Sequence, residues 1–367
     1  MVNKMIVSNI FHRPIRTAVS ILAVAIEVGM VMLVVGMTTG LVNDTARRVE
    51  GVGADVLVQP PGASFILGLT QAPMPIKIGD LLRDKVPHVL AITPVLFQFN
   101  LSGGVNIIYG IDMETFNRVT GGFVYHFGGP LVAPYDILVD DWYAKANRVK
   151  VGQSLNFLNH DFRVIGIVEH GKGARLFIPL DTAEDLSGAH DKASIFFVKC
   201  TDPGYTDDVV NSIHQLLPKY QILSVSEYMS LMTSNNLPAL NAFITALISV
   251  AVAIGFLVIF LSMYTTITER THEIGILKSL GASKGYIIEL ILREAGLLCL
   301  IGIVAGYAGT MIAKRVILNT FPTLTVELTV GWALWAALLA AGGSLLGAFY
   351  PALRAAQSDP VDALAYE

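Results

Sequence analysis

The sequence predicts a membrane protein with four transmembrane α-helices and a large α+β extracytoplasmic domain inserted between the first and second helices. Hydrophobic residues make up 53% of the 367 residues and charged residues only 15%. This balance is too apolar for an ordinary soluble protein. Apolar windows long enough to cross a bilayer, which takes roughly 20 helical residues, are Thr17–Val42, Ala239–Thr268, Ala295–Ala313 and Leu328–Leu353.

The segment before the first window, residues 1–16, predicts a helix that lies along the cytoplasmic membrane surface. Ile6, Ile10 and Phe11 share one helical face, and Pro14 interrupts the run. The alternative is an irregular start of the first span. That span, residues 17–42, is longer than the apolar region of a cleaved signal peptide, so we expect a retained anchor.

Residues 43–238 predict a folded α+β domain, because strand-like and helix-like patterns alternate along them. The strand-like stretches are "DILVDDWYAK", "SLNFLNHDFRVIGIVEH", "RLFIPL" and "SIFFVKC", with a turn at Asn159-His160-Asp161. The amphipathic, helix-like stretches are "TDDVVNSIHQLL" and "SVSEYMSLM". A segment of this length can bury a core of its own.

The distribution of basic residues predicts the orientation of the chain, since Lys and Arg favour the cytoplasmic side of short loops. Lys4, Arg13 and Arg16 precede the first span, basic residues recur between the second and third, and Arg354 follows the fourth. Both termini are then cytoplasmic, and the chain crosses the membrane several times. Lys314 and Arg315 oppose this rule, but their side chains can reach the headgroups.

The same reasoning sets the remaining boundaries. We expect spans at 239–268, 288–318 and 328–353, an outer turn at 319–327 and a cytoplasmic tail at 354–367. The span at 288–318 contains the window Ala295–Ala313.

The segment between the second and third spans, residues 269–287, predicts a short cytoplasmic helix from Glu269 to Leu280. Ile274, Leu277 and Leu280 form a narrow apolar stripe, which Glu269, Glu273 and Lys278 flank. Gly281 follows where a helix ends in a left-handed turn. A rigid helix between two spans can transmit a push to both, although spacing alone also fits a charged loop.

The stretch "ERTHEIGILKSLGASKGYI" resembles the signature loop of the FtsX-like, MacB-type permease family of type VII ABC transporters. In that family this loop is the coupling helix, which docks on the nucleotide-binding subunit. The resemblance therefore implies ATPase-coupling roles for Glu269, Arg270, Glu273, Ile274, Gly275, Leu277, Lys278 and Gly281.

Other segments resemble the same family. "YPALRAAQSDPVDALAYE" is similar to its C-terminal ending, with Pro351, Arg354, Asp359, Pro360 and Ala363 in place. "SNIFHRPIRTAVSILAVAIEVGMVMLV" resembles its first helix and span, although Pro14 departs from the usual pattern. The region around "ILVDDWYAKANRVKVGQSLNFLNHDFRVIGIVEHGKGARLFIPL" is similar to its extracytoplasmic domain.

The sequence contains no G-x-x-x-x-G-K-[ST] phosphate-binding loop. We therefore expect no cofactor on this chain, and ATP and Mg²⁺ on a separate ABC ATPase subunit. The resemblance implies two ATPase copies, a second copy of the permease, and a membrane-fusion adaptor or periplasmic carrier as a further partner. Membrane lipids surround the spans, and a net charge of −4 suggests no nucleic-acid partner.

Glu27 and several glycines stand out within the spans. An ionisable residue in mid-span suggests a polar cavity, a dimer interface or a cargo contact, or a hydrogen bond within the four-helix unit. Gly302 with Gly306, and Gly343 with Gly347, allow close helix approach. Such pairs join helices either within one subunit or between subunits.

Metal and catalytic chemistry find little support in the sequence. His272-Glu273 begins like a zinc-protease motif, but Ile276 stands where the second histidine is needed. His160, His170 and His190 show no ligand spacing, and Cys200 and Cys299 offer no disulfide framework. We therefore expect a non-catalytic permease, without metal, that exports or extracts an amphiphilic substrate; the alternative is an FtsX-like signalling subunit that activates an envelope hydrolase.

Overall fold

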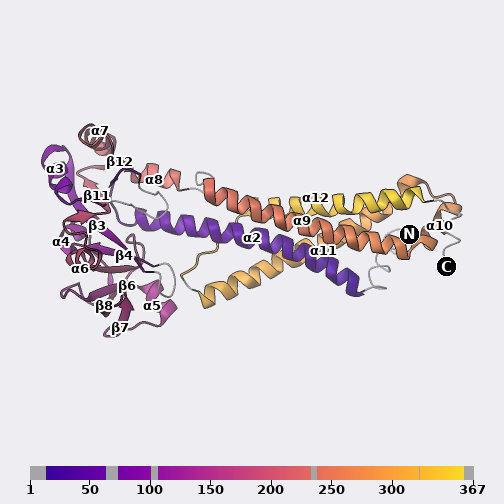
Figure 1. Ribbon diagram of the computed structural model, residues 1–367, viewed down its shortest axis with the longest axis horizontal. Coiled ribbons are helices and arrows are strands. Elements are labelled where there is room, and N and C mark those ends of the chain that lie inside the picture. Colours follow the sequence, from indigo (N-terminus) through magenta and orange to yellow (C-terminus); the bar gives the residue numbers. More distant parts are fainter. Residues whose placement is uncertain (1–13, 63–72, 101–105, 233–237, 322, 359–367) are drawn as a thin grey trace. The chain divides into compact units, whose positions relative to one another are not determined.

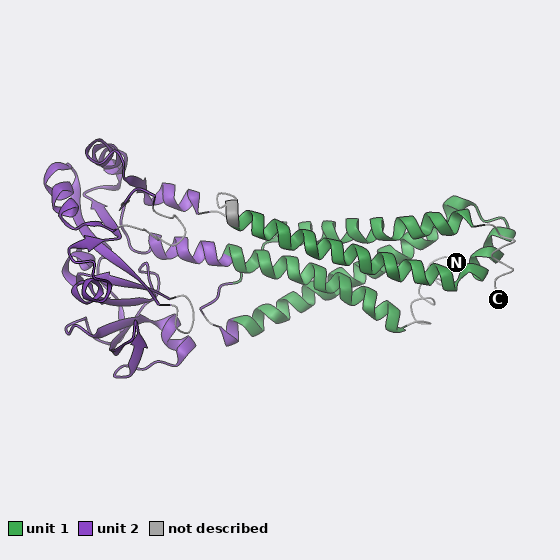
Figure 2. Cartoon of the chain, viewed as in Figure 1, with its two compact units in different colours: residues 1–39, 238–317, 326–367 green, residues 40–237, 318–325 purple. Residues whose placement is uncertain are grey.

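The computed structural model describes residues 14–62, 73–100, 106–232, 238–321 and 323–358 (Figure 1). The chain divides into two compact units (Figure 2). Unit 1 comprises residues 1–39, 238–317 and 326–367, and unit 2 comprises residues 40–237 and 318–325.

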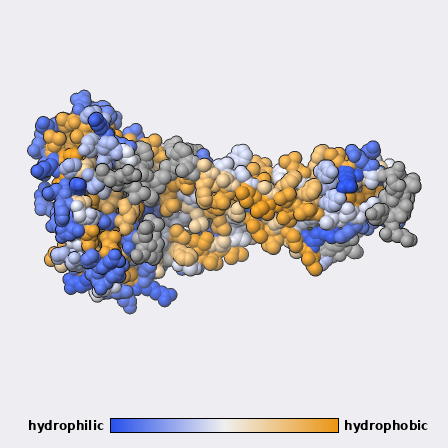
Figure 3. All heavy atoms as spheres, viewed as in Figure 1, coloured by the Kyte–Doolittle hydropathy of each residue, from blue (hydrophilic) through white to orange (hydrophobic). Residues whose placement is uncertain are grey.

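Unit 1 is helical. Its helices are α2 (Pro14–Glu50, whose last residues belong to unit 2), α9 (Pro238–Glu269), α10 (Thr271–Ser279), α11 (Lys284–Thr320) and α12 (Val330–Gln357). Among the described residues, α2, α9 and α12 are long and apolar enough to cross a membrane. The predicted third span, residues 288–318, lies inside the continuous helix α11, and its crossing of a membrane stays a prediction. Hydrophobic residues predominate on the visible face along the middle of these helices, and hydrophilic residues gather toward the end where α10 lies (Figure 3).

Small residues let the helices of unit 1 approach closely. A Cβ atom on Gly302 would lie 2.6 Å from Val24 Cβ, and one on Gly306 would lie 2.8 Å from Val28 Cβ, both on α2. A Cβ atom on Gly347 would lie 2.8 Å from the Phe256 carbonyl oxygen on α9. Both glycine pairs therefore join helices of the same chain, which is one of the alternatives that the sequence leaves open.

Unit 2 contains a ten-stranded mixed sheet in the order β12-β1-β11-β3-β4-β9-β6-β8-β5, with β7 paired to β8. The strands are β1 (Val56–Gln59), β3 (Val89–Asn100), β4 (Asn106–Ile111), β5 (Tyr125–Gly128), β6 (Asp136–Asp140), β7 (Ser154–Phe157), β8 (His160–Val168), β9 (Leu176–Pro179), β11 (Ile195–Cys200) and β12 (Gln221–Ser224). Pairs β4·β9 and β6·β8 are parallel. A small second sheet pairs β2 (Met74–Pro75) with β10 (Lys192–Ala193).

Short helices pack on this sheet and close two apolar cores. One core gathers residues from β1 and β11 with Leu82 of α3 (Lys77–Lys85) and Val209 of α7 (Thr206–Leu216). The other joins strands β4, β6, β8 and β9 with Ala144 and Ala183, which belong to α5 (Asp141–Asn147) and α6 (Leu180–Ser187). The remaining helices are α4 (Met113–Thr120), η1 (Pro203–Tyr205) and α8 (Val225–Leu231).

The structure corrects several expectations for unit 2. "DWYAK" forms α5 rather than a strand, because the Asp140 side chain accepts a hydrogen bond from the Tyr143 backbone N–H and caps a helix there. The turn between β7 and β8 is formed by Leu158 and Asn159, both with positive φ, so His160 already belongs to β8.

Helix boundaries in unit 1 also differ from those expected. Helix α2 continues past residue 42 to Glu50, α11 ends at Thr320, and α12 runs from Val330 to Gln357, past residue 353. The predicted helix over Glu269–Leu280 is shorter, because α9 includes Glu269 and α10 ends at Ser279. Residues 1–13 of the expected surface helix, and Asp359, Pro360 and Ala363, lie outside the described residues.

Candidate functional site

Helix α10 is bounded by short, well-defined joints. Only Arg270 separates it from α9. At its other end Gly281 adopts a φ of 95°, the left-handed conformation that the sequence predicts. The Ser283 hydroxyl then accepts a hydrogen bond of 3.2 Å from the Tyr286 backbone N–H and caps α11. Because these connections are short, α10 can move little without α9 and α11.

Helix α10 has a buried face and an exposed face. Ile274 is 8% exposed, Gly275 is buried, and Leu277 packs against the apolar core of unit 1. Ile276 is 41% exposed and Leu280, just after the helix, is 80% exposed. His272, Glu273 and Ser279 are exposed as well. Leu280 therefore does not continue the buried stripe of Ile274 and Leu277, because the helix has ended.

Ion pairs tie the start of α10 to two other helices. Arg270 Nη1 lies 3.5 Å from Glu294 Oε2 on α11, and both side chains are 12% exposed. Arg16, near the start of α2, donates to both Glu269 carboxylate oxygens, at 2.9 and 2.6 Å. The Arg270–Glu294 pair is buried, and removing one partner of a buried pair is costly. Arg270 thus faces inward, and its ATPase-coupling role stays a prediction.

Lys278 connects α10 to the end of α12. Its Nζ donates 2.9 Å to the Ala356 carbonyl oxygen and also donates to the Ser358 carbonyl oxygen. A cation at these carbonyls stabilises the helix C-terminus. Arg354 donates 2.8 Å to the Tyr264 hydroxyl on α9, and Pro351 is buried inside α12. These family-motif residues hold α12 in place within unit 1.

Glu27 is buried within unit 1, with 4% of its surface exposed. A Cβ atom at Gly255 of α9 would lie 1.9 Å from Glu27 Oε2, so a larger residue at this position would displace the carboxyl group. Among the described residues neither carboxyl oxygen has a hydrogen-bond partner. The hydrogen bond within the four-helix unit is therefore not found there, and a functional role for Glu27 stays a prediction.

A charged cluster in unit 2 was not anticipated from the sequence. Arg175 Nη2 lies 3.1 Å from Asp44 Oδ2 and donates 3.1 Å to the Thr323 carbonyl oxygen. Arg175 Nη1 lies 3.4 Å from Asp140 Oδ2, and its guanidinium carbon lies 5.3 Å from the centre of the Trp142 ring. One arginine thus joins the last turns of α2, the start of α5 and the turn after α11.

Burial dominates the electrostatics of this cluster. It raises the pKa of Asp140 from 3.8 to about 6, although Arg175 and the hydrogen bond from Tyr143 act in the opposite direction. Burial also lowers the pKa of Arg175, and Asp140 and Asp44 partly offset that effect. No local sequence pattern links Arg175 to Asp44, Asp140 and Thr323, so only the fold could have revealed the cluster.

Across the parts of the chain that the structure describes, no group of three or more His, Cys, Asp or Glu side chains could hold a metal ion. Trp142 stacks on His170, whose Nδ1 lies 2.9 Å from Asp141 Oδ1. This histidine therefore packs against the charged cluster.

Comparisons with known proteins match most of the chain. The model of the FtsX-like permease C-terminal family matches residues 245–360, and that of the MacB-like periplasmic core domain matches residues 17–216. The macrolide export ATP-binding/permease protein MacB of Sodalis glossinidius is 28% identical over 97% of this chain and 59% of its own length. MacB of Mannheimia succiniciproducens is 24% identical over 99% of this chain and 60% of its own length. The chain thus spans about 60% of the length of these relatives.

Two solved structures resemble part of the chain. The periplasmic region of MacB from Actinobacillus actinomycetemcomitans is 18% identical, covers 48% of this chain and 92% of its own, and gives a TM-score of 0.37. The extracellular domain of the ABC-type transporter YknZ from Gram-positive bacteria is 12% identical, covers 46% of this chain and 98% of its own, and also gives 0.37.

The apolar helices make the chain a membrane protein, and the MacB-like periplasmic core match over residues 17–216 spans more than half of its 367 residues. Together with the FtsX-like match that follows along the sequence, this shows that the chain belongs to the FtsX-like, MacB-type family of ABC transporter permeases.

Proposed function

We propose that this chain is the membrane subunit that couples ATP hydrolysis on a separate ABC ATPase to a conformational change of its outer domain. The outer domain then exports or extracts an amphiphilic substrate. The observation that carries this proposal is the two-sided helix α10, whose buried face packs into unit 1 while Ile276 and Leu280 stay exposed. An exposed apolar pair beside a charged residue such as Glu273 suits a docking partner.

The proposed topology follows the sequence. Helices α2, α9, α11 and α12 cross the inner membrane, residues 43–238 lie outside, and both termini and α10 lie in the cytoplasm. Two permease copies associate with two ATPase copies, which bind ATP and Mg²⁺, and a membrane-fusion adaptor or periplasmic carrier receives the substrate. The family membership and the names of the MacB relatives support this arrangement.

The contacts of α10 supply the mechanism. A push on its exposed face reaches α11 through Arg270 and Glu294, and reaches α12 through Lys278. It reaches α2 through Glu269, which adjoins the joint and pairs with Arg16. The push moves these helices only if α10 binds the nucleotide states of the ATPase with different affinity.

The test is a pair of charge substitutions on the exposed face, Ile276→Glu and Leu280→Glu. Each places a charge in the proposed docking interface without disturbing the core. We therefore expect the affinity of the permease for the ATPase subunit to fall about tenfold or more. Coupled ATPase activity should fall with it. The measurements are pull-down of the ATPase and ATP turnover of the assembled complex.

The matched control is Val132→Glu, an equally drastic change at a side chain of unit 2 that is 86% exposed. It should leave both assembly and ATP turnover unchanged. Normal assembly and turnover in both α10 variants would contradict the proposal.

Activation of an envelope hydrolase is the less favoured function, since the MacB-like match covers residues 17–216. Crosslinking of the outer domain in cells distinguishes the two functions. A hydrolase as the captured partner would favour signalling, and a carrier or adaptor would favour transport.

A further inference from the structure

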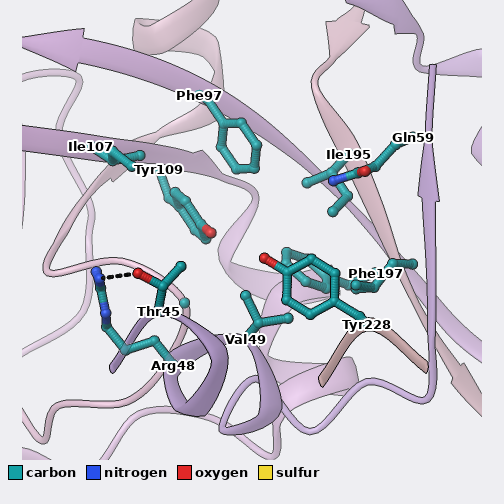
Figure 4. Close-up of a pocket in the computed structure, with 12 residues that line it drawn as sticks. Thr45, Arg48, Val49, Gln59, Phe97, Ile107, Tyr109, Ile195, Phe197 and Tyr228 are labelled. Atoms are coloured by element: carbon teal, nitrogen blue, oxygen red, sulfur yellow. Dashed lines mark hydrogen bonds between the residues drawn. The ribbon is translucent and has the colours of Figure 1, made fainter. Parts of the chain in front are cut away.

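A cavity in unit 2 has room for water and for little more (Figure 4). Phe97, Tyr109 and Phe197, from β3, β4 and β11, line it together with Gln59 of β1. It leaves about 40 Å³ for the centres of water-sized molecules, and a single water needs roughly 10–15 Å³. The cavity beside Gln59 therefore suits ordered water and not an organic ligand.

Unit 1 offers a larger surface, a stripe of aromatic rings where α9 and α12 lie side by side (Figure 1). Phe256, Phe260 and Tyr264 follow one another by one turn on α9, and the centres of successive rings lie 6.2 Å apart. Tyr350 of α12 joins them, with its ring centre 6.0 Å from that of Phe260. Tyr350 is 57% exposed, and the rings of α9 are partly exposed. The stripe therefore presents open aromatic surface.

Arg354 places a positive charge at one end of this stripe. It lies one turn after Tyr350, in the last turn of α12, and is exposed. Its Nη1 donates 2.8 Å to the Tyr264 hydroxyl, and its guanidinium carbon lies 5.5 Å from the centre of the Tyr264 ring. Both contacts are with an uncharged group, so neither balances the charge of Arg354.

The charge of Arg354 sets it apart from most arginines nearby. Three other arginines of unit 1 each pair with a glutamate: Arg16 with Glu269, Arg270 with Glu294, and Arg293 with Glu289. Within the ranges that the structure describes, no carboxylate pairs with Arg354. A guanidinium also has more N–H groups than its one bond to Tyr264 uses. Arg354 can therefore bind an anion without giving up a contact.

A phospholipid matches this combination of groups. Guanidinium N–H groups bind phosphate oxygens in parallel pairs, and the Tyr264 hydroxyl, which accepts from Arg354, still has a proton to donate. The aromatic stripe and Leu346, which is 68% exposed one turn before Tyr350, supply apolar surface for an acyl chain. Helices α9 and α12 are long and apolar enough to cross a membrane. An arginine in the last turn of such a helix reaches the headgroups.

We infer that the face of α9 and α12 that ends at Arg354 is a binding site for an anionic phospholipid. The lipid phosphate lies against Arg354 and Tyr264, and an acyl chain lies along Phe260 and Phe256. Phosphatidylcholine binds more weakly, because its choline cation cancels the charge of its phosphate. The site requires α9 and α12 to lie in a membrane, and it does not depend on the proposed coupling function.

The experiment titrates the full chain, in uncharged detergent, with phosphatidylglycerol or phosphatidylcholine and counts bound lipids by native mass spectrometry. The first phosphatidylglycerol should bind more tightly than the first phosphatidylcholine. Arg354→Gln should weaken its binding about fivefold, since one arginine near the headgroups contributes about that much. Tyr264→Phe keeps the ring and should weaken it about threefold.

The matched control is Arg293→Gln, which removes the same charge from an arginine that already pairs with Glu289. It should bind phosphatidylglycerol as the unaltered protein does. Phosphatidylcholine binding should be equal in all variants, which shows that the helices still fold. Water-soluble glycerol phosphate should not displace the lipid, because it lacks the acyl chains that the aromatic stripe holds.

Four outcomes would overturn the inference. Arg354→Gln binds phosphatidylglycerol normally, or Arg293→Gln weakens binding as much. Arg354→Gln loses phosphatidylcholine binding to the same extent, which would indicate a general disturbance of this face. Glycerol phosphate displaces the lipid, which would indicate a site for free phosphate. Dissociation of a dimer by Arg354→Gln, with lipid binding unchanged, would assign the face to a second copy of the chain and so falls under the first outcome.

Discussion

Asp140 combines two tasks at a single carboxyl group. It is 1% exposed, it caps α5 through the Tyr143 backbone N–H, and it lies 3.4 Å from Arg175. Burial raises its pKa to about 6 in spite of these favourable contacts. Desolvation of the charged form thus outweighs the arginine, as expected where a carboxylate loses nearly all its water.

Asp140→Asn should remove a pH dependence of local stability. A folded-state pKa above the ordinary 3.8 means that the folded form holds the proton more tightly. The stability from Asp140 is therefore complete below about pH 4 and is lost as the pH rises through about 6. The loss is about 3 kcal/mol for a pKa that rises from 3.8 to about 6.

Hydrogen exchange of the Tyr143 amide measures this effect. The protection of the unaltered protein relative to Asp140→Asn should fall between about pH 4 and pH 6 and stay level above pH 7. Parallel profiles would show that Asp140 does not titrate in this range.

Glu27 and Gly255 illustrate a second constraint on single residues. Gly255→Ala should destabilise unit 1 by about 1–3 kcal/mol, because the added methyl group overlaps the Glu27 carboxyl group. The double variant Gly255→Ala, Glu27→Ala should recover most of that loss. Thermal unfolding in nanodiscs measures both.

The control is Gly342→Ala on α12, where an added Cβ would meet open space. It should be neutral or slightly stabilising, because alanine favours a helix more than glycine does. Equal losses at Gly342 and Gly255 would mean that the overlap with Glu27 is not the cause.

At the scale of elements, the sequence correctly predicts turns and helices whose conformation depends on residues close together along the chain. The left-handed Gly281 and the amphipathic helices α7 and α8 follow directly from the sequence. The apolar and aromatic letters of "DWYAK" favoured a strand, but the cap at Asp140 decided for a helix. Leu280 was misplaced because apolar spacing does not show where a helix ends.

Lys278 gives a test of the contacts between elements. Lys278→Met should loosen the last turn of α12 by about 1 kcal/mol, because the carbonyl oxygens of Ala356 and Ser358 lose their cation. Hydrogen exchange over residues 354–358 measures this. Lys284→Met, a lysine that begins α11, is the control and should leave those amides unchanged.

If exchange over residues 354–358 is unaltered in Lys278→Met while ATPase binding is lost, Lys278 serves the partner rather than α12. The sequence alone supports that second assignment. The structure supports the first, since Lys278 already contacts two carbonyl oxygens of its own chain.

At the scale of the whole molecule, long-range pairing decides what the sequence cannot show. Asp44, Asp140, Arg175 and Thr323 come together only after the fold has formed. The same is true of the cavity beside Gln59, whose walls come from α2, four strands and α8. Composition and apolar windows gave the membrane class, but neither measures distance between remote residues.

Arg175→Gln should release the segments that this arginine joins. Amide exchange over residues 40–50 and 318–325 should speed up by about tenfold or more, since a buried charged hydrogen-bond network is broken. Arg163→Gln is the control, because Arg163 pairs with Asp136 but is itself 65% exposed. Unchanged exchange in Arg175→Gln would show that apolar packing alone holds these segments.

Helix α2 passes from unit 1 into unit 2 without a break, from Pro14 to Glu50. Each residue of an α-helix turns the chain by about 100°. Deleting a single residue between Asp44 and Arg48 would therefore turn Asp44 by about 100° around the helix axis relative to Arg48. Asp44 could then no longer pair with both Arg48 and Arg175.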